Sequence, residues 1–141
     1  MASQYQHRQF FRRVPNALLA QFFEARVADL GVDFAFEGNT YDADAIKTFA
    51  DAAAGTGIKV FASIVLLKSL GMAKYLNSIK GVPNIPEPVM QKIAKSPIKQ
   101  KACLEIAADF VREIRKVCNG IVICPLGWET KVPELLDMLK E

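Results

Sequence analysis

The stretch KVFASIVLLKSLGMAKYLN (residues 59–77) predicts the fold of this chain. From Val60 to Leu67 it is apolar and rich in β-branched residues, without alternation of polar and apolar positions. Such a run is typical of a strand buried on both faces, as in a parallel sheet. Lys68 and Ser69 end the run, and SLGMAKYLN after it has the pattern of a short helix. A strand that leads directly into a helix is typical of β/α architecture.

The same pattern extends outward in both directions from this stretch. In chain order we expect helix 16–30, strand 32–38, helix 42–55, strand 59–67, helix 69–77, helix 86–94, helix 98–117, strand 120–126 and helix 128–141. Strands separated by helices pair in parallel through right-handed crossovers. The sequence therefore predicts an α/β fold, a partial (β/α) TIM-barrel-like unit with three parallel strands and flanking helices.

We assign residues 1–16 to an N-terminal basic and aromatic segment and residues 17–141 to the partial barrel domain. Three strands do not close a barrel, and they leave two sheet edges that proteins seldom leave bare. Either the chain forms a small open α/β layer, or it completes its sheet with another copy or a partner chain. The segment QYQHRQFFRR (4–13) is either solvated or docked on a partner, or it is an arm that contacts bases or a lipid surface.

Composition excludes several other classes of protein. The chain has 141 residues, a formal net charge of +3, three cysteines and a single histidine, His7. The modest charge favours no nucleic-acid partner, and the apolar runs are far shorter than the roughly 20 residues of a membrane span. We expect a cytoplasmic protein with free thiols and no membrane partner, and one histidine gives no basis for a zinc site.

Polar groups follow each predicted strand, where parallel α/β proteins bind ligands. Glu37 and Asn39 follow the first strand, Lys68 and Ser69 the second, and Trp128 the third. Lys68 and Ser69 form an anion site at a helix start, or Ser69 only caps that helix and Lys68 is solvated.

Two further strand-end groups, Glu37 and Trp128, also have alternative interpretations, and Cys124 has a single interpretation. Glu37 binds or protonates a substrate nitrogen, or it pairs with Lys68 on the neighbouring strand. Trp128 is a stacking wall for a flat ligand, or it covers the core. Cys124 is interpreted as a core residue, because no histidine is near to activate its thiol.

Four stretches of the sequence resemble the C-terminal part of the methylenetetrahydrofolate reductase family, over roughly residues 26–141. The stretches are GVDFAFEGNTYD (31–42), LKSLGMAKYLN (67–77), GVPNIPEPVMQKI (81–93) and GWETKVPELL (127–136). The LKSLGMAKYLN stretch is the most specific of them. The chain departs from the family where Glu37-Gly38 replaces a strand-end Thr-Gln that helps hold the pterin, and where Leu66 replaces a proline.

The resemblance implies the last three strands of a flavin-dependent (β/α)8 barrel. It implies a methylenetetrahydrofolate-reductase-like protein or subunit that supplies the folate-side wall of the site and is inactive alone. The implied wall residues are Glu37, Asn39, Lys68, Ser69, Met72 and Trp128. FAD or FMN would bind only with a partner chain, because the strands that carry most flavin contacts have no counterpart here. The alternative is a non-catalytic half-barrel, a binding or assembly protein that has lost flavin chemistry.

Overall fold

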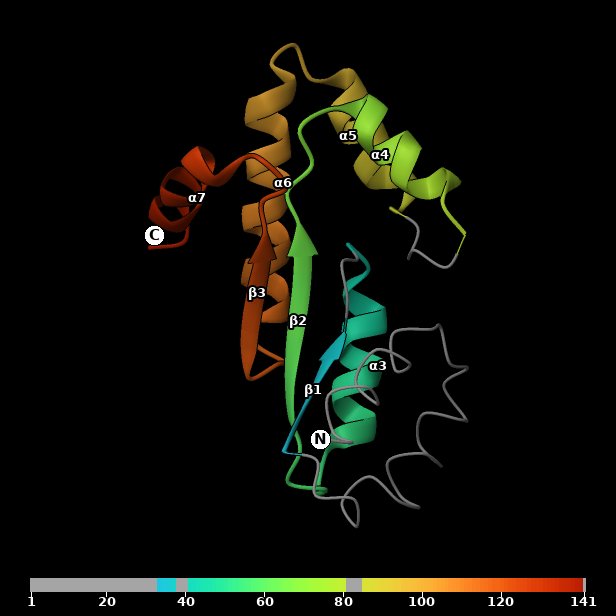
Figure 1. Ribbon diagram of the computed structural model, residues 1–141, viewed down its shortest axis with the longest axis vertical. Helices are drawn as coiled ribbons and strands as arrows, with labels where there is room; N and C mark the ends of the chain where they lie inside the picture. The colour runs from blue at the N-terminus through green and yellow to red at the C-terminus, as the bar shows by residue number, and fades with distance from the viewer. Residues whose placement is uncertain (1–32, 38–40, 81–84, 141) are drawn as a thin grey trace.

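The computed structural model describes residues 33–37, 41–80 and 85–140. These residues form an α/β fold in which a three-stranded, all-parallel sheet is flanked by five helices (Figure 1). The elements in chain order are β1 (Phe34–Glu37), α3 (Ala43–Ala53), β2 (Lys59–Val65), α4 (Leu70–Ser78), α5 (Glu87–Lys95), α6 (Lys99–Ile114), β3 (Gly120–Cys124), a 3-10 turn η3 (Glu129–Lys131) and α7 (Val132–Met138). The predicted α/β class and the three parallel strands are confirmed.

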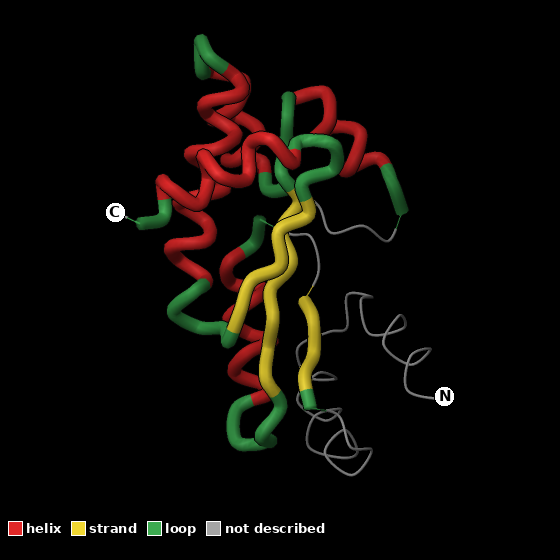
Figure 2. Tube along the Cα trace, turned by 60° about the vertical axis from the view of Figure 1, so that its left-hand side comes forward, coloured by secondary structure: helices red, strands yellow, loops and turns green. Residues whose placement is uncertain are grey.

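The strands follow one another across the sheet in the order β1-β2-β3, and both pairs are parallel (Figure 2). Their ends are staggered. Glu37, the last residue of β1, pairs with Ala62, whereas Cys124, the last residue of β3, pairs with Val65. The β2–β3 ladder then continues by one bond, from Leu66 N to Cys124 O at 2.9 Å. Thus β2 and β3 end together, and β1 stops three positions earlier along β2.

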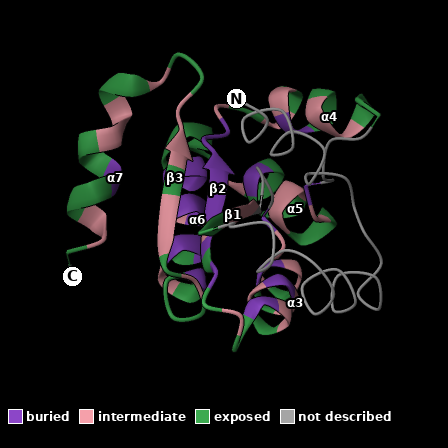
Figure 3. Cartoon of the chain, turned by 60° about the horizontal axis from the view of Figure 1, so that its bottom comes forward, coloured by how far each residue is buried: buried purple, intermediate pink, exposed green. Residues whose placement is uncertain are grey.

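Helices α3 and α6 cover one face of the sheet (Figures 1 and 2). From β2, Val60, Ala62 and Ile64 point to this face and are buried, and Figure 3 shows the buried residues concentrated on β2 and α6. Ala62 and Ile64 share a core cluster with residues of α3 and α6, among them Ile46 and Ala107. The side chains on this face of β2 therefore pack against the two helices and form part of the core.

The opposite face of the sheet is aromatic. Phe34, Phe36 and Phe61 share it, with ring centroids 5.4 to 6.1 Å apart. Phe34 is 42% exposed and Val122 on β3 is 38% exposed. None of the described helices packs on this face, as the two ribbon views show (Figures 1 and 2).

Two predicted helix starts are confirmed in atomic detail. The Asp42 carboxylate accepts a hydrogen bond from Ala45 N at 3.1 Å and begins α3, and the Ser69 hydroxyl accepts one from Met72 N at 3.1 Å and begins α4. Each side chain satisfies a backbone N–H that has no partner within the helix. Pro86 is the N-cap of α5 rather than part of its first turn.

Two predicted helix boundaries were wrong by three residues or more. Helix α6 ends at Ile114 rather than at residue 117, because the chain must turn there to reach β3, and Val117 is 38% exposed. The last helix begins at Val132 rather than at Trp128. Pro133 has no N–H group and is accommodated in the first turn of α7, so the preceding residues form the separate turn η3.

Candidate functional site

The carboxyl ends of β2 and β3 bring two distant segments of the chain together. Lys68 follows β2 and is half-buried, and its ammonium nitrogen lies over the backbone of Gly127, which follows β3. A Cβ atom added to Gly127 would lie 3.1 Å from Lys68 Nζ. This edge is where parallel α/β proteins place ligands, so we take it as the candidate functional site.

A tight turn from Pro125 to Trp128 forms the β3 side of the site. Trp128 N donates to Pro125 O at 3.1 Å, and the two central residues are left-handed, with φ of 46° at Leu126 and 80° at Gly127. Glycine adopts this conformation freely, but a leucine there costs about 1–3 kcal/mol. Strained backbone of this kind is enriched at functional sites, which supports the choice of this edge.

The side chain of Glu129 bonds back to the turn that precedes it. Its Oε1 accepts a hydrogen bond from Gly127 N at 3.0 Å. Bonds from its own backbone N–H and from Gly127 N–H lower the pKa of the Glu129 carboxyl, and the nearby Lys68 ammonium lowers it further, while slight desolvation opposes them. The carboxylate is therefore ionised at neutral pH and faces Lys68 across the turn. The predicted site residues did not include Glu129, although a glutamate two residues after a glycine was the available signal.

Ser69 and Met72 have structural roles in α4. The Ser69 hydroxyl accepts the Met72 N–H as the helix cap, which is compatible with both interpretations, so the anion site stays a prediction. The Met72 side chain is half-buried and packs against the main core. Trp128 is also half-buried and packs against that core, in agreement with its interpretation as a cover for the core.

Of the remaining predicted site residues, Glu37 ends the shorter strand β1, and Asn39 lies outside the described residues. Glu37 ends β1 level with Ala62, so its β2 partner lies six residues before Lys68 along the chain. At about 3.3 Å per strand residue, this stagger separates the ends of β1 and β2 by roughly three residues, or 10 Å. Pairing of Glu37 with Lys68 stays a prediction. Asn39 and the segment 1–16 lie outside the described residues.

Tyr41 is a residue at this edge that the sequence did not single out. It is buried, with 5% of its surface exposed, and its hydroxyl donates to Val65 O at 2.6 Å, at the end of β2. Burial raises the pKa of the Tyr41 phenol well above its usual value, while a backbone hydrogen bond from Leu67 partly opposes the shift. The phenol therefore stays protonated and anchors the end of β2 to the chain before α3.

The three cysteines are free thiols. Cys103 in α6 is buried, and desolvation raises the pKa of its thiol to about 11. Cys124 is half-buried at the end of β3, with its sulfur 3.4 Å from the Ser63 hydroxyl. A nucleophilic cysteine needs a lowered pKa and a base. Cys103, with its raised pKa, is therefore a core residue.

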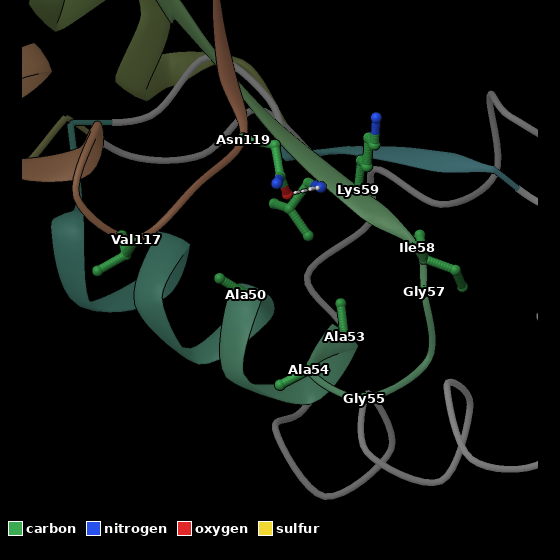
Figure 4. A pocket seen from close by; sticks show the side chains of 10 residues that line it. Ala50, Ala53, Ala54, Gly55, Gly57, Ile58, Lys59, Val117 and Asn119 are labelled. Atoms are coloured by element: carbon green, nitrogen blue, oxygen red, sulfur yellow. Dashed lines mark hydrogen bonds between the residues drawn. The ribbon is translucent and has the colours of Figure 1, made fainter.

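A cavity of about 280 Å³ lies at the opposite ends of the strands (Figure 4). The end of α3 and the turn through Gly55 and Gly57 line one side, and the starts of β2 and β3 line the other. Asn119 Oδ1 accepts a hydrogen bond from Val60 N at 2.9 Å, and the side chain of Lys59 points away from the alanines of α3 (Figure 4). In barrel folds this end serves stability rather than chemistry, so the cavity is not part of the candidate site.

Comparison of the chain with models of known protein families gives no match, and comparison with curated protein sequences gives none either. In the described part of the chain, no helix combines the length and the apolar character needed to cross a membrane.

Proposed function

We propose that this chain supplies the folate-side wall of a flavin-dependent reductase of the methylenetetrahydrofolate reductase type. The supporting observation is the position of Lys68 over Gly127. These residues belong to the LKSLGMAKYLN and GWETKVPELL stretches, which carry the resemblance and are far apart in the sequence. Because they meet at the ligand-binding edge of a parallel sheet, both resembling stretches contribute to one site.

The proposed role of the wall is to bind and orient the substrate. Lys68 offers an ammonium group to an acidic or carbonyl group, and Trp128 limits the site on the β3 side. Glu37 and Asn39 belong to the proposed wall through the resemblance alone. A flavin would carry the hydride when bound, since reduction of a methylene folate needs a cofactor for that step.

The described residues do not themselves fit a flavin. One cavity that they form lies at the amino ends of the strands, away from Lys68, and half of its lining residues are alanine or glycine. Both edge strands, β1 and β3, lack a further strand among the described residues. We therefore propose that a partner chain, or a further copy, supplies the strands that hold the cofactor.

A second candidate function is a non-catalytic half-barrel that binds a small molecule or a protein. The observation that favours it is the structural role of residues in the proposed wall. Ser69 caps α4, and Met72 and Trp128 pack against the core. Glu37-Gly38 also replaces the family's Thr-Gln pair, which removes a group that holds the pterin.

Binding of 5-methyltetrahydrofolate by isothermal titration calorimetry tests the proposal. We expect Lys68→Ala to weaken binding by about tenfold, which corresponds to 1.4 kcal/mol. The matched control is Lys140→Ala, which removes an exposed lysine near the end of α7. Both variants should unfold within about 0.5 kcal/mol of the parent chain. Equal binding by the parent and Lys68→Ala would contradict the role of Lys68, and a colourless parent chain that binds no folate would favour the second candidate.

A further inference from the structure

Glu129 is a charged residue at the candidate site that has no assigned role in ligand binding. Nothing in the sequence resemblance assigns it a role, and one oxygen of its carboxylate bonds to the turn after β3. It accepts the Gly127 N–H at 3.0 Å and lies two residues beyond that glycine. The Lys68 ammonium, in turn, lies over Gly127. Gly127 thus bonds to one charged group of the site through its N–H, and the other lies next to the position that a Cβ atom would occupy.

We propose that Glu129 is a positioning residue, which holds Gly127 in the left-handed turn and thereby fixes where Lys68 presents its ammonium group to a ligand. The inference rests on the proposed function for the identity of the ligand, but not for the geometry of the turn. Glu129 acts through Gly127 and is not itself assigned a contact with substrate.

Two features of the turn support the proposal that Glu129 acts on Lys68 through Gly127. Leu126 has a φ of 46°, a conformation that leucine seldom adopts, so interactions around the turn must hold it in place. The Glu129–Gly127 bond closes the turn from one side, and Trp128 N bonds to Pro125 O within it. A larger residue at Gly127 would be strained at its φ of 80°, and its Cβ, 3.1 Å from Lys68 Nζ, would require the lysine end group to shift slightly.

The test measures the mobility of lysine ammonium groups by ¹⁵N relaxation in the ligand-free chain. Its reference is Lys74, an exposed lysine on α4. In the parent chain the Lys68 ammonium should have a clearly higher order parameter than that of Lys74. Glu129→Ala should lower the Lys68 value to that of Lys74. Glu129→Gln should keep most of the restriction, since a glutamine oxygen still accepts the Gly127 N–H.

The control variant is Glu134→Ala, which removes a carboxylate bonded to Lys131 at 2.8 Å on the neighbouring helix. It should leave Lys68 unchanged. A Lys68 group as mobile as Lys74 in the parent chain, or unchanged in Glu129→Ala, would overturn the proposal. Loss of restriction in Glu129→Gln would overturn it too, because charge attraction rather than the turn would then hold Lys68.

A second measurement separates this proposal from the proposed function. Titration with 5-methyltetrahydrofolate should show binding about tenfold weaker in Glu129→Ala than in the parent, and near-parental binding in Glu129→Gln. If neither the parent chain nor any variant binds this folate, the proposed function fails. The relaxation result still decides whether Glu129 positions Lys68. If the parent binds and Glu129→Ala binds equally well, the positioning role fails and the proposed function stands.

Discussion

The side-chain amide of Asn77 pairs with the backbone of Ile85 in both directions. Ile85 N donates to Asn77 Oδ1 at 2.6 Å, and Asn77 Nδ2 donates to Ile85 O at 3.1 Å. Nδ2 also lies 3.2 Å from the sulfur of Met90 in α5. Ile85 is 2% exposed, so this pair satisfies two backbone groups that water cannot reach. The last turn of α4 is thereby fixed to the residue that precedes α5.

Replacement of Asn77 should destabilise the fold more than its surface position suggests. Asn77→Ala leaves both backbone groups of Ile85 unpaired, and an unsatisfied buried polar group costs about 1–3 kcal/mol. We expect the free energy of unfolding, measured by urea denaturation, to fall by about 2 kcal/mol. The control Gln91→Ala removes an exposed 3.4 Å contact with Glu87 and should change stability by less than about 0.5 kcal/mol. Equal effects of the two variants would show that the Asn77 pair carries no stability.

Gly120 should tolerate no side chain, although it lies in a strand. A Cβ atom there would meet two ring atoms of Phe61 at 2.5 Å. Gly120→Ala must displace that ring and disturb its packing with Phe36, so we expect a loss of about 1–3 kcal/mol in thermal unfolding. In Gly71→Ala the added Cβ lies 3.7 Å from the Ser69 hydroxyl, within a helix. That variant should be neutral or more stable by up to about 1 kcal/mol. A neutral Gly120→Ala would contradict the contact with Phe61.

Much of this fold follows from local patterns in the sequence. The apolar run before Lys68 predicts the central strand because a parallel strand is buried on both faces. Asp42 and Ser69 predict helix starts because their short side chains reach the backbone N–H groups of the first turn. The stagger of β1 against β2 is different. No pattern within the strand ending at Glu37 says which residue of β2 it will face, since register depends on loop length and packing across the sheet.

The site was less predictable than the fold for the same reason. The sequence shows that Lys68 and Trp128 each follow a strand, but not that the lysine ammonium lies over Gly127. That contact depends on β2 and β3 ending at the same level, with Val65 opposite Cys124. Tyr41 was missed because a tyrosine before a helix cap gives no local sign that its hydroxyl will reach Val65.

The chain should lose stability at alkaline pH through two buried acids. Burial raises the pKa of Cys103 from 9.0 to about 11 and raises that of Tyr41 further above its usual value. Above about pH 9 the unfolded chain releases these protons while the folded chain retains them, so the stabilisation that exists below pH 9 is lost as pH rises. Each group can contribute a slope of up to about 1.4 kcal/mol per pH unit. Urea denaturation from pH 8 to 11 measures this slope.

Variants identify the groups responsible for the alkaline slope. Cys103→Ala should flatten the slope between about pH 9 and 10, and Tyr41→Phe should flatten it above about pH 10. Tyr41→Phe should also cost about 1–2 kcal/mol at neutral pH, because it removes the bond to Val65 O. Tyr75, which is 66% exposed, provides the control Tyr75→Phe, with an unchanged slope. An unaltered slope in both buried-site variants would refute the assignment.

The face of the sheet on which none of the described helices packs should drive association of the purified chain. Phe34 and Val122 are exposed there, and β1 and β3 are both edge strands among the described residues. We expect a dimer or larger assembly in light scattering at micromolar concentration. Val122→Lys, which places a charge on this face, should shift the chain toward monomer. Leu136→Lys changes an apolar residue of α7 that is 47% exposed, and it should not. A stable monomer at this concentration would contradict the prediction.

The last prediction is that this polypeptide alone does not reduce a methylene folate. The described residues offer Lys68, Glu129 and the turn between them, which suit binding and orientation, and we have proposed that a flavin would bind only with a partner chain. Under the proposed resemblance, Gly38 also stands where the family has a glutamine that helps hold the pterin, and a missing positioned hydrogen bond costs about 3–4 kcal/mol of transition-state stabilisation. Anaerobic oxidation of NADH or NADPH with added flavin and methylenetetrahydrofolate should therefore show no turnover. Turnover of about 1–1000 per second by the chain alone would contradict the proposal that a partner chain must supply the flavin site. Turnover that requires a second chain, and that falls in Lys68→Ala but not in Lys140→Ala, would place Lys68 in a shared site.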